Sequence, residues 1–318
     1  MQLGYFYSNS YKNALLNIID KNKDFDIKYF HLIRSGYYAQ LLGIKDSIQA
    51  MQISFTLNYM RVVKNQKNIF IKFLYYLELL LIKKYEKKTL DFFLKCLLIS
   101  HHDLKAITGK ESHKNVIFSP HGIDTKYFKR KTIYESNDNP KIIFPANFSS
   151  EANKEAAFWM VNDVFPIIKK KYPNSSLMLL GNNPHKSIHS LKSDQILVTG
   201  FVDDLRPYLE RGDILVNPIR SSSGMQNKVI MGLSFGIPVV TTNTSVEGMK
   251  IPEELLFLAG NTSDEFALKV LDAIETDYNT KLKYISNGSN YADEYWTWNY
   301  HFLELEKEFK KISIRKDK

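Results

Sequence analysis

The stretch DILVNPIRSSSGMQNKVIMGLSFGIPVV, residues 213–240, contains two apolar runs with a helix-like segment between them. DILVNPI is apolar almost throughout, and a polar loop with a glycine follows it. The next run, QNKVIMGLSF, has the apolar spacing of a helix and stops at Gly236, a residue type that commonly ends helices. PVV then begins a second strand. A strand, a helix and a strand in this order predict two parallel strands joined by a crossover helix.

The same alternation extends on both sides of this stretch. Apolar runs at 141–149, 176–182 and 195–202 precede it, and LLFLAG at 255–260 follows it. These runs are continuously apolar, which is typical of parallel strands covered on both faces. We therefore predict a doubly wound α/β domain in the second half of the chain. Such sheets bind ligands where loops leave the carboxyl ends of strands and meet helix N-termini.

The loop RSSSGMQNK, residues 220–228, has the residue types of an anion site. It leads into a helix predicted to begin near Gln226, and a helix N-terminus attracts anions through its N–H groups and its dipole. Arg220 and Lys228 add two positive charges, and Gly224 lets the backbone approach a ligand closely. A diphosphate is the anion that we expect, and an ordinary loop before a helix is the alternative. The loop lacks the GxxxxGK[ST] pattern of nucleoside-triphosphatases.

Positive charge is concentrated in the first half of the chain. The net charge is +9; residues 1–134 hold 22 Lys/Arg against 10 Asp/Glu, whereas residues 135–318 hold 21 against 24. The excess predicts an anionic partner for the first half, such as a membrane surface or a phosphorylated lipid. Nucleic acid is a further candidate, but no basic and aromatic interleaved motif supports it, and we expect none to be bound. Lysine-rich helices that only face solvent are the remaining alternative.

The longest predicted helix, from about Asn68 to Lys88, lies in this basic half. Seven apolar residues recur on one side of it at spacings of three and four, namely Phe70, Phe73, Leu74, Leu77, Leu80, Leu81 and Tyr85. Packing of this side against a core is the interpretation that we favour. A helix that lies in a membrane interface is the alternative.

Several features predict the compartment and exclude classes of site. Neither an apolar run of membrane-spanning length nor a secretion signal pattern is evident. The single cysteine, Cys96, stands in the apolar run FFLKCLLIS, which predicts a buried thiol. His185 and His189 have a helical spacing but lack the carboxylate of a zinc motif, and we expect no metal site. We expect a cytoplasmic protein, with a peripheral position on the inner face of the cytoplasmic membrane as an alternative.

A series of motifs resembles a known family. The motifs are SPHGIDTKYF (119–128), FPANFSSEANKEAAFW (144–159), VTGFVDDLRPYLERGDILVNPI (198–219), SGMQNKVIMGLSFGIPVVTT (223–242) and SVEGM (245–249). In this order and spacing they resemble the nucleotide-sugar-binding domain of GT-B glycosyltransferases, in particular the retaining glycosyltransferase family 4 of bacterial polysaccharide, O-antigen and capsule clusters. The resemblance covers about residues 115–310. It implies an α/β fold of GT-B type, with two Rossmann-like domains that face a cleft and a shortened N-terminal domain.

The resemblance also implies how the chain is divided and what it does. It implies an acceptor-side domain at 1–134, a nucleotide-sugar-binding domain at 135–290 and a C-terminal helix at 291–318 that crosses back to the first domain. The implied reaction transfers a sugar from a UDP- or GDP-sugar to a saccharide or a polyprenyl-diphosphate-linked saccharide. No metal and no cofactor are implied, because cations and the helix dipole stabilise the leaving diphosphate.

Matching the family motifs residue by residue implies a donor site. Its residues are Gly181, Gly200, Phe201, Val202, Arg220, Ser223, Gly224, Met225, Gln226, Asn227, Lys228, Met231, Glu247 and Gly248. The diphosphate is expected between Arg220 and Lys228, and the base near the turn at 200–202. On the acceptor side, His31 and Arg34 follow a predicted strand of the first half and are our candidates for catalysis.

Two departures from the family pattern bear on activity. The family has two glutamates eight positions apart, of which the second binds the ribose hydroxyls; Ser223 and Met231 occupy these positions. A thioether is a poor acceptor for two hydroxyl groups. In addition, only about 115 residues precede SPHGID, fewer than the family's N-terminal domain has. The alternative function is therefore a catalytically weak nucleotide-sugar-binding subunit that a partner chain completes. A sugar epimerase of the same fold is a further alternative, although we can place no acid and base carboxylates for it.

Overall fold

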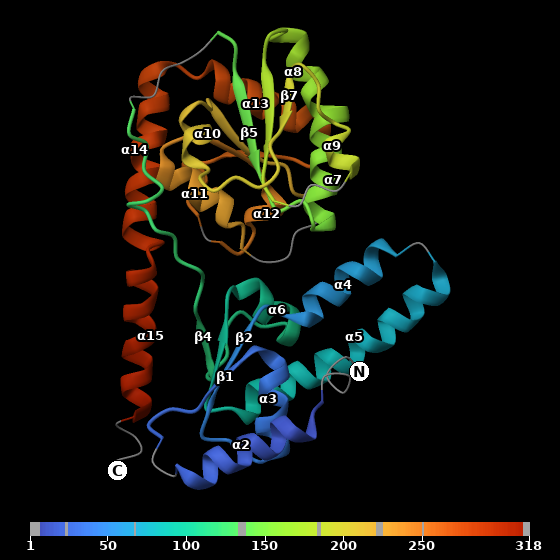
Figure 1. Ribbon diagram of the computed structural model, residues 1–318, viewed down its shortest axis with the longest axis vertical. Coiled ribbons are helices and arrows are strands. Elements are labelled where there is room, and N and C mark those ends of the chain that lie inside the picture. Colours follow the sequence, from blue (N-terminus) through green and yellow to red (C-terminus); the bar gives the residue numbers. More distant parts are fainter. Residues whose placement is uncertain are drawn as a thin grey trace. The chain divides into compact units, whose positions relative to one another are not determined.

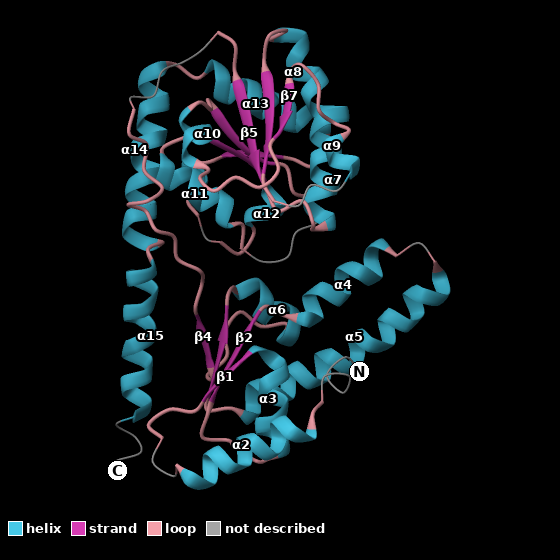
Figure 2. Ribbon diagram, viewed as in Figure 1, coloured by secondary structure: helices cyan, strands magenta, loops and turns pink. Residues whose placement is uncertain are grey.

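The computed structural model describes residues 7–22, 25–66, 68–132, 138–182, 186–220, 225–249 and 251–313. Contacts between residues divide the chain into two compact units. One consists of Met1–Pro120 with His301–Lys318, and the other of His121–Tyr300. Each unit contains a parallel sheet with helices packed on it, so the predicted α/β class is confirmed (Figures 1 and 2). The domain limits expected at 134 and 290 stay predictions.

The second unit contains a doubly wound sheet. Among the described residues it has six parallel strands in the order β10-β9-β8-β5-β6-β7. The strands are β5 (Lys141–Pro145), β6 (Ser176–Leu180), β7 (Ile196–Val198), β8 (Ile214–Asn217), β9 (Val239–Thr242) and β10 (Phe257–Ala259). The chain proceeds from β5 outward to β7 and then returns to β8 on the other side of β5. The predicted parallel α/β unit is therefore confirmed.

Helices cover both faces of this sheet (Figure 2). They are α7 (Glu151–Trp159), η1 (Met160–Val164), α8 (Phe165–Lys171), α9 (Lys186–His189), α10 (Arg206–Glu210), α11 (Asn227–Phe235), α12 (Asn243–Val246), η2 (Glu253–Leu255), α13 (Ser263–Glu275) and α14 (Tyr278–Tyr295). Ile142 and Phe144 of β5 pack with α7, η1, α8 and α13, whereas Ile143 packs on the opposite face with α10, α11 and α14. Because successive side chains of a strand point to opposite faces, a strand covered on both faces is apolar throughout.

The first unit has a smaller parallel sheet. In the described part of the chain it has four strands in the order β1-β2-β3-β4, which are β1 (Tyr29–His31), β2 (Ile48–Gln52), β3 (Lys95–Leu98) and β4 (Val116–Phe118). Its helices are α2 (Asn9–Lys21), α3 (Leu32–Leu41), α4 (Phe55–Asn65), α5 (Ile69–Phe92) and α6 (His101–Thr108). Ile312, near the end of α15 (Trp298–Ser313), packs on Ile48, Ala50 and Leu97. Cys96 is buried as predicted, and burial raises the pKa of its thiol.

The predicted packing of the long helix is wrong for its first half. The helix itself is confirmed as α5, and Ile82 and Leu90 near its end are buried in the core of the first unit. Phe70, in contrast, is 71% exposed, and Phe73, Leu74, Leu77, Leu80 and Leu81 are exposed as well. The reason is that α5 extends beyond the sheet, where α4 covers only one of its sides. No helix within the described residues has the length and apolar character needed to cross a membrane.

Two elements have less simple bounds than their residue patterns indicate. In the apolar run around Cys96 the strand begins only at Lys95, because Asp91 and Phe92 still belong to α5. Between β5 and β6 the chain forms α7, η1 and α8 in succession, with a single π-helical turn at Met160–Val164.

Candidate functional site

The candidate site lies at the carboxyl edge of the six-stranded sheet, where the strand order reverses. β5 pairs with β6 on one side and with β8 on the other, so the loops that leave β5 and β8 diverge to opposite faces of the sheet. In open α/β sheets a crevice forms between such loops, and ligands bind there. The loop after β5 leads into α7, and the loop after β8 leads toward α11.

The N-terminus of α11 is directed at this edge. Gln226 is the N-cap residue, its side chain does not cap the helix, and its backbone N–H donates to Sδ of Met249 at 3.4 Å. At the other end Gly236 adopts φ 78°, a left-handed conformation that suits glycine. Its backbone N–H caps the helix by donating to the carbonyl oxygens of Gly232 and Leu233. Because α11 is buried from Val229 to Phe235, its position on the sheet is well defined.

Lys228, in the first turn of α11, is held over the end of β5. Its Nζ donates to Oδ1 of Asn153 at 3.0 Å and lies 4.8 Å from the ring centroid of Phe144. Burial lowers the pKa of Lys228 to about 7, because the charged ammonium loses water contacts. Among the described residues no carboxylate lies within ion-pair distance of the Lys228 ammonium, in contrast to the guanidinium of Arg220, which pairs with Glu155. An anion bound beside Lys228 would therefore hold it in the charged form.

Arg220, after β8, contacts the same helix that Asn153 belongs to. Its guanidinium carbon lies 4.3 Å from the ring centroid of Trp159, and its Nη2 lies 3.2 Å from Oε1 of Glu155. Asn153 and Glu155 are two positions apart in the first turns of α7. The structure thus brings both predicted cations to the start of α7, at the crevice between β5 and β8.

A cavity of about 470 Å³ opens beside Lys228 within the second unit. It is lined by His121, Gly122, Ile123, Asp124, Phe128, Pro145, Ala146, Leu205, Asn227, Lys228, Ile230, Met231 and Trp298. Met231 lines this cavity and also packs in the apolar cluster beneath α11, with only 7% of its surface exposed. Burial lowers the pKa of His121, whose ring lies 6.0 Å from that of Trp298. The cavity therefore combines apolar side chains with Asn227 and Lys228 at the start of α11.

Glycines shape the neighbouring strand ends. Gly181 follows β6 with φ 151°, and a Cβ there would lie 1.7 Å from the carbonyl oxygen of Ala146, so only glycine fits. Gly200 follows β7 with φ 74°, and the hydroxyl of Thr199 accepts from the N–H of Gly181 at 3.4 Å. Phe201 is 67% exposed beside them. The part of the predicted donor site that we expect to bind the nucleotide base therefore has an exposed phenyl ring close to two glycines with positive φ.

The other predicted donor residues lie around the same edge or outside the described residues. Val202 and Met225 are partly buried, and Met225 packs against the cluster beneath α11. Glu247 is exposed and Gly248 adopts φ 101°; both directly precede Met249, whose sulfur meets the N–H of Gln226. Ser223, Gly224 and His185 lie outside the described residues.

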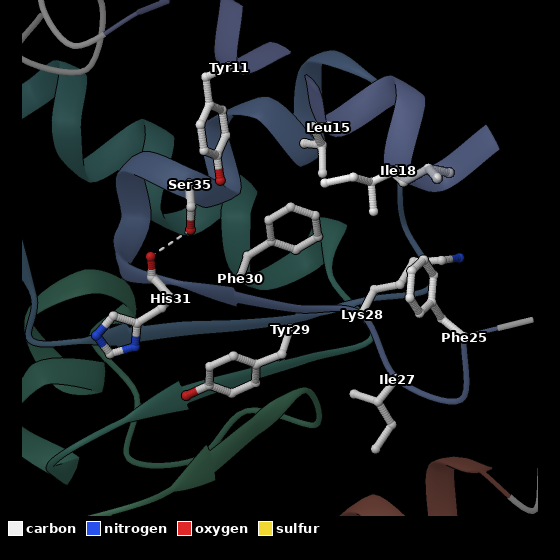
Figure 3. A pocket seen from close by; sticks show the side chains of 11 residues that line it. Tyr11, Leu15, Ile18, Phe25, Ile27, Lys28, Tyr29, Phe30, His31 and Ser35 are labelled. Atoms are coloured by element: carbon white, nitrogen blue, oxygen red, sulfur yellow. Dashed lines mark hydrogen bonds between the residues drawn. The ribbon is translucent and has the colours of Figure 1, made fainter. Parts of the chain in front are cut away.

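The acceptor-side candidates belong to the first unit. His31 ends β1 and is exposed, and its carbonyl oxygen accepts from Oγ of Ser35 at 2.5 Å. Arg34 is exposed on the first turn of α3. Figure 3 shows His31 at one end of a cavity of about 420 Å³ whose lining is mostly apolar, with Tyr11, Leu15 and Phe30 among its residues.

Sequence reasoning missed two groups of residues. Asn153, Glu155 and Trp159 organise the two cations, and their position in the helix after β5 was the signal that could have identified them. Leu32, the first residue of α3, and Gln52, the last residue of β2, have φ of 64° and 66°. Positive φ at a non-glycine residue is strained and concentrates at functional sites, but no residue-type pattern predicts it.

Comparison with known proteins finds a family profile within the second unit. Residues 139–276 match the profile of the family described as "Glycosyl transferases group 1". An uncharacterised 44.6 kDa protein in the cps region of Klebsiella pneumoniae is 25% identical over 202 residues, which cover 60% of this chain and 50% of that protein. The chain thus spans about half the length of the curated relative that it matches.

Solved structures show the fold. Sucrose-phosphate synthase from Thermosynechococcus elongatus has a TM-score of 0.71 at 14% identity and covers 95% of this chain and 77% of its own. Anabaena HepE in complex with UDP-glucose has a TM-score of 0.67 at 11% identity, and the match covers 93% of this chain and 81% of HepE. The fold is GT-B, with a parallel sheet in each of two Rossmann-like halves, and the profile match at residues 139–276 lies in the second of them.

Proposed function

We propose that this protein is a glycosyltransferase that transfers a hexose from a UDP- or GDP-sugar, with retention of configuration, to a saccharide or polyprenyl-diphosphate-linked saccharide. The reaction belongs to surface polysaccharide biosynthesis, which is consistent with the relative from the cps region. The observation that carries the proposal is the meeting of Lys228, Arg220 and the N-terminus of α11 at the strand-order reversal of the second sheet. This arrangement suits a diphosphate.

The donor diphosphate would lie against the N-terminus of α11. Negative charge beside Lys228 raises the pKa of its ammonium, so binding above pH 7 takes up a proton. Arg220 can turn from Glu155 to a phosphate oxygen, since both side chains are partly exposed. As the glycosidic bond to the diphosphate breaks, these cations and the helix dipole stabilise the leaving group without a metal ion.

The acceptor would bind on the first unit, with His31 and Arg34 as the catalytic candidates. A lipid-linked acceptor requires the enzyme to work at a membrane surface. We therefore also propose a peripheral position at the inner face of the cytoplasmic membrane, in line with the basic residues of the first half.

A nucleotide-sugar-binding subunit with weak or no activity is the second candidate. The observation that favours it is Met231, which lines the cavity with an apolar surface. In the glycosyltransferase family that the sequence resembles, this position holds the glutamate that binds the ribose. Such a subunit would need a partner chain that completes the catalytic machinery.

Calorimetric titration with UDP and GDP tests the donor site. We expect one nucleotide to bind, the substitution Lys228→Met to weaken it about tenfold to a hundredfold, and EDTA to leave the affinity unchanged. At pH 8, titrations in buffers of different ionisation enthalpy should reveal proton uptake that Lys228→Met abolishes. Lys192→Met, at an exposed lysine away from the site, is the control. Absence of binding by both nucleotides would contradict the proposal.

The substitution Met231→Glu separates the two candidate functions. If position 231 faces the ribose, the new carboxylate should tighten UDP or GDP binding several-fold, and transfer from the matching nucleotide-sugar should rise with it. Tighter binding without transfer to any lipid-linked acceptor supports the binding subunit. Unchanged affinity shows that Met231 serves packing alone.

A further inference from the structure

Six large apolar side chains form an exposed stripe along α5. Phe70 is 71% exposed and Leu77, the least exposed of the six, is 42% exposed. The members of this α5 stripe are Phe70, Phe73, Leu74, Leu77, Leu80 and Leu81. They recur at spacings of three and four, so they lie on one side of the helix. A contiguous exposed apolar surface of this kind marks an interaction site.

The opposite side of α5 is already occupied. Ile82, Glu86 and Thr89 are buried against the first unit, and the ring of Tyr75 lies 6.1 Å from that of Tyr59 on α4. α4 and α5 therefore pack as a hairpin, whose far end extends beyond the four-stranded sheet (Figure 1). The α5 stripe is on the side that this packing leaves uncovered.

Buried polar contacts fix the base of the hairpin. The carboxylate of Glu86 accepts the backbone N–H groups of Phe55 and Thr56 at 2.7 and 3.0 Å and the hydroxyl of Ser54 at 3.0 Å. Asp103 of α6 also accepts the N–H of Ser54, at 2.8 Å. Because the start of α4 is tied to α5 and to α6, the α5 stripe keeps a defined orientation on the first unit.

Lysines continue the same side of α5 where the α5 stripe ends. Lys84, Lys87 and Lys88 are exposed in the next two turns, and Lys72 and Lys83 are exposed beside the stripe. Residues 55–92 hold eight Lys/Arg against three Asp/Glu. A second copy of the hairpin would bring these like charges together, whereas an anionic surface would neutralise them. We infer that the α4–α5 hairpin docks on an anionic phospholipid surface.

The dimensions of the hairpin suit this occupant. The twelve residues from Phe70 to Leu81 extend for about 18 Å along the helix axis at 1.5 Å per residue. The apolar side of an interfacial helix enters about 5–10 Å into the boundary between headgroups and acyl chains. The α5 stripe occupies that depth, while Lys84, Lys87 and Lys88 bind the phosphate groups at the surface. This inference builds on the peripheral membrane position proposed above by naming the surface that makes the contact, and it does not depend on the donor site.

Flotation with lipid vesicles tests the inference. The full chain is mixed with phosphatidylcholine vesicles that contain or lack 30% phosphatidylglycerol. We expect flotation with the anionic vesicles, about tenfold weaker partitioning for Lys84→Gln/Lys87→Gln/Lys88→Gln and at least about a hundredfold weaker partitioning for Phe70→Gln/Phe73→Gln/Leu77→Gln. Higher salt should weaken binding of the wild type and of the apolar variant.

Matched controls show whether the effect belongs to the hairpin. Leu268→Gln/Leu303→Gln removes exposed apolar side chains elsewhere, and Lys110→Gln/Lys126→Gln/Lys192→Gln removes exposed charges elsewhere; both should partition as the wild type does. Circular dichroism must show an unchanged Tm for all four variants. In Leu77→Trp, brominated lipids should quench the added fluorescence. Equal flotation of the apolar variant and the wild type, or loss of a dimer in sedimentation without any lipid binding, overturns the inference.

Discussion

Helices α11 and α5 are both rich in apolar residues and both carry lysine, yet the fold treats them in opposite ways. α11 is buried from Val229 to Phe235, because it lies between the second sheet and α14. α5 is exposed over most of its first half, because α4 covers only one side of it there. The comparison shows that an apolar helix is buried only where the topology supplies neighbours on all of its apolar sides.

Each helix also holds an ionisable group whose pKa is shifted by burial, and the two groups have different hydrogen-bond partners. Glu86 of α5 is satisfied by N–H and hydroxyl donors at the start of α4, although burial raises the pKa of its carboxyl. Lys228 of α11 has the amide oxygen of Asn153 as its acceptor, and burial lowers its pKa to about 7. Glu86 therefore acts as a structural group, whereas Lys228 is the group that we propose to bind the donor diphosphate.

The largest expected difference in stability is between two phenylalanine-to-alanine substitutions, one in α11 and one in α5. Phe235→Ala removes a ring that is 1% exposed and lies 5.3 Å from the guanidinium of Arg130, and it should lower the free energy of unfolding of the second unit by about 4 kcal/mol. Phe73→Ala removes a ring that is 56% exposed and should change stability by less than about 0.5 kcal/mol. Urea denaturation followed by circular dichroism measures both. Similar losses for the two variants would show that the first half of α5 is packed in solution.

The next largest effect concerns the base of the hairpin. Glu86→Ala leaves the N–H groups of Phe55 and Thr56 without their buried acceptor, and it should destabilise the first unit by about 3 kcal/mol. Glu86→Gln keeps one acceptor oxygen and should cost about 1 kcal/mol. A loss of less than 0.5 kcal/mol for the alanine variant, roughly the level of a surface substitution, would mean that these bonds do not hold the hairpin.

The pH dependence of stability distinguishes the two ionisable groups. Because the pKa of Glu86 is raised in the folded protein, the folded state binds more protons just above pH 4.5, and stability should fall as pH rises through that window. Glu86→Gln should flatten this slope. Thermal denaturation across pH 4–7 measures it, with the wild type as reference.

The smallest effect is the opposite slope at Lys228. Its pKa is lowered from 10.5 to about 7, so between these values the unfolded state binds more protons and stability should rise with pH. The gain from pH 7 to 9 should be about 1 kcal/mol, since the Lys228 side chain as a whole is only partly buried and solvent reduces the effect of the shift. Lys228→Met should abolish this slope, whereas Lys84→Met at an exposed lysine of α5 should keep it. A slope that persists in Lys228→Met would assign it to another group.

Much of the second unit could be predicted from the sequence. Continuously apolar runs indicated strands covered on both faces, and Gly236 marked the end of α11. The anion site indicated by the loop at 220–228 stays a prediction. Periodicity also identified α5 as a helix. It could not show which side of α5 would meet the core, because the apolar residues that face solvent and those that face α4 have the same spacing.

The sequence by itself determined the parallel α/β architecture of the second half and the position of its polar loop, because strand and helix patterns depend on residues close together along the chain. Only the tertiary structure decided that Asn153 accepts a hydrogen bond from the ammonium of Lys228 and that Arg220 contacts Glu155 and Trp159. It also decided that the α5 stripe faces solvent. These contacts join residues far apart along the chain, and burial depends on which neighbours the topology brings to each surface.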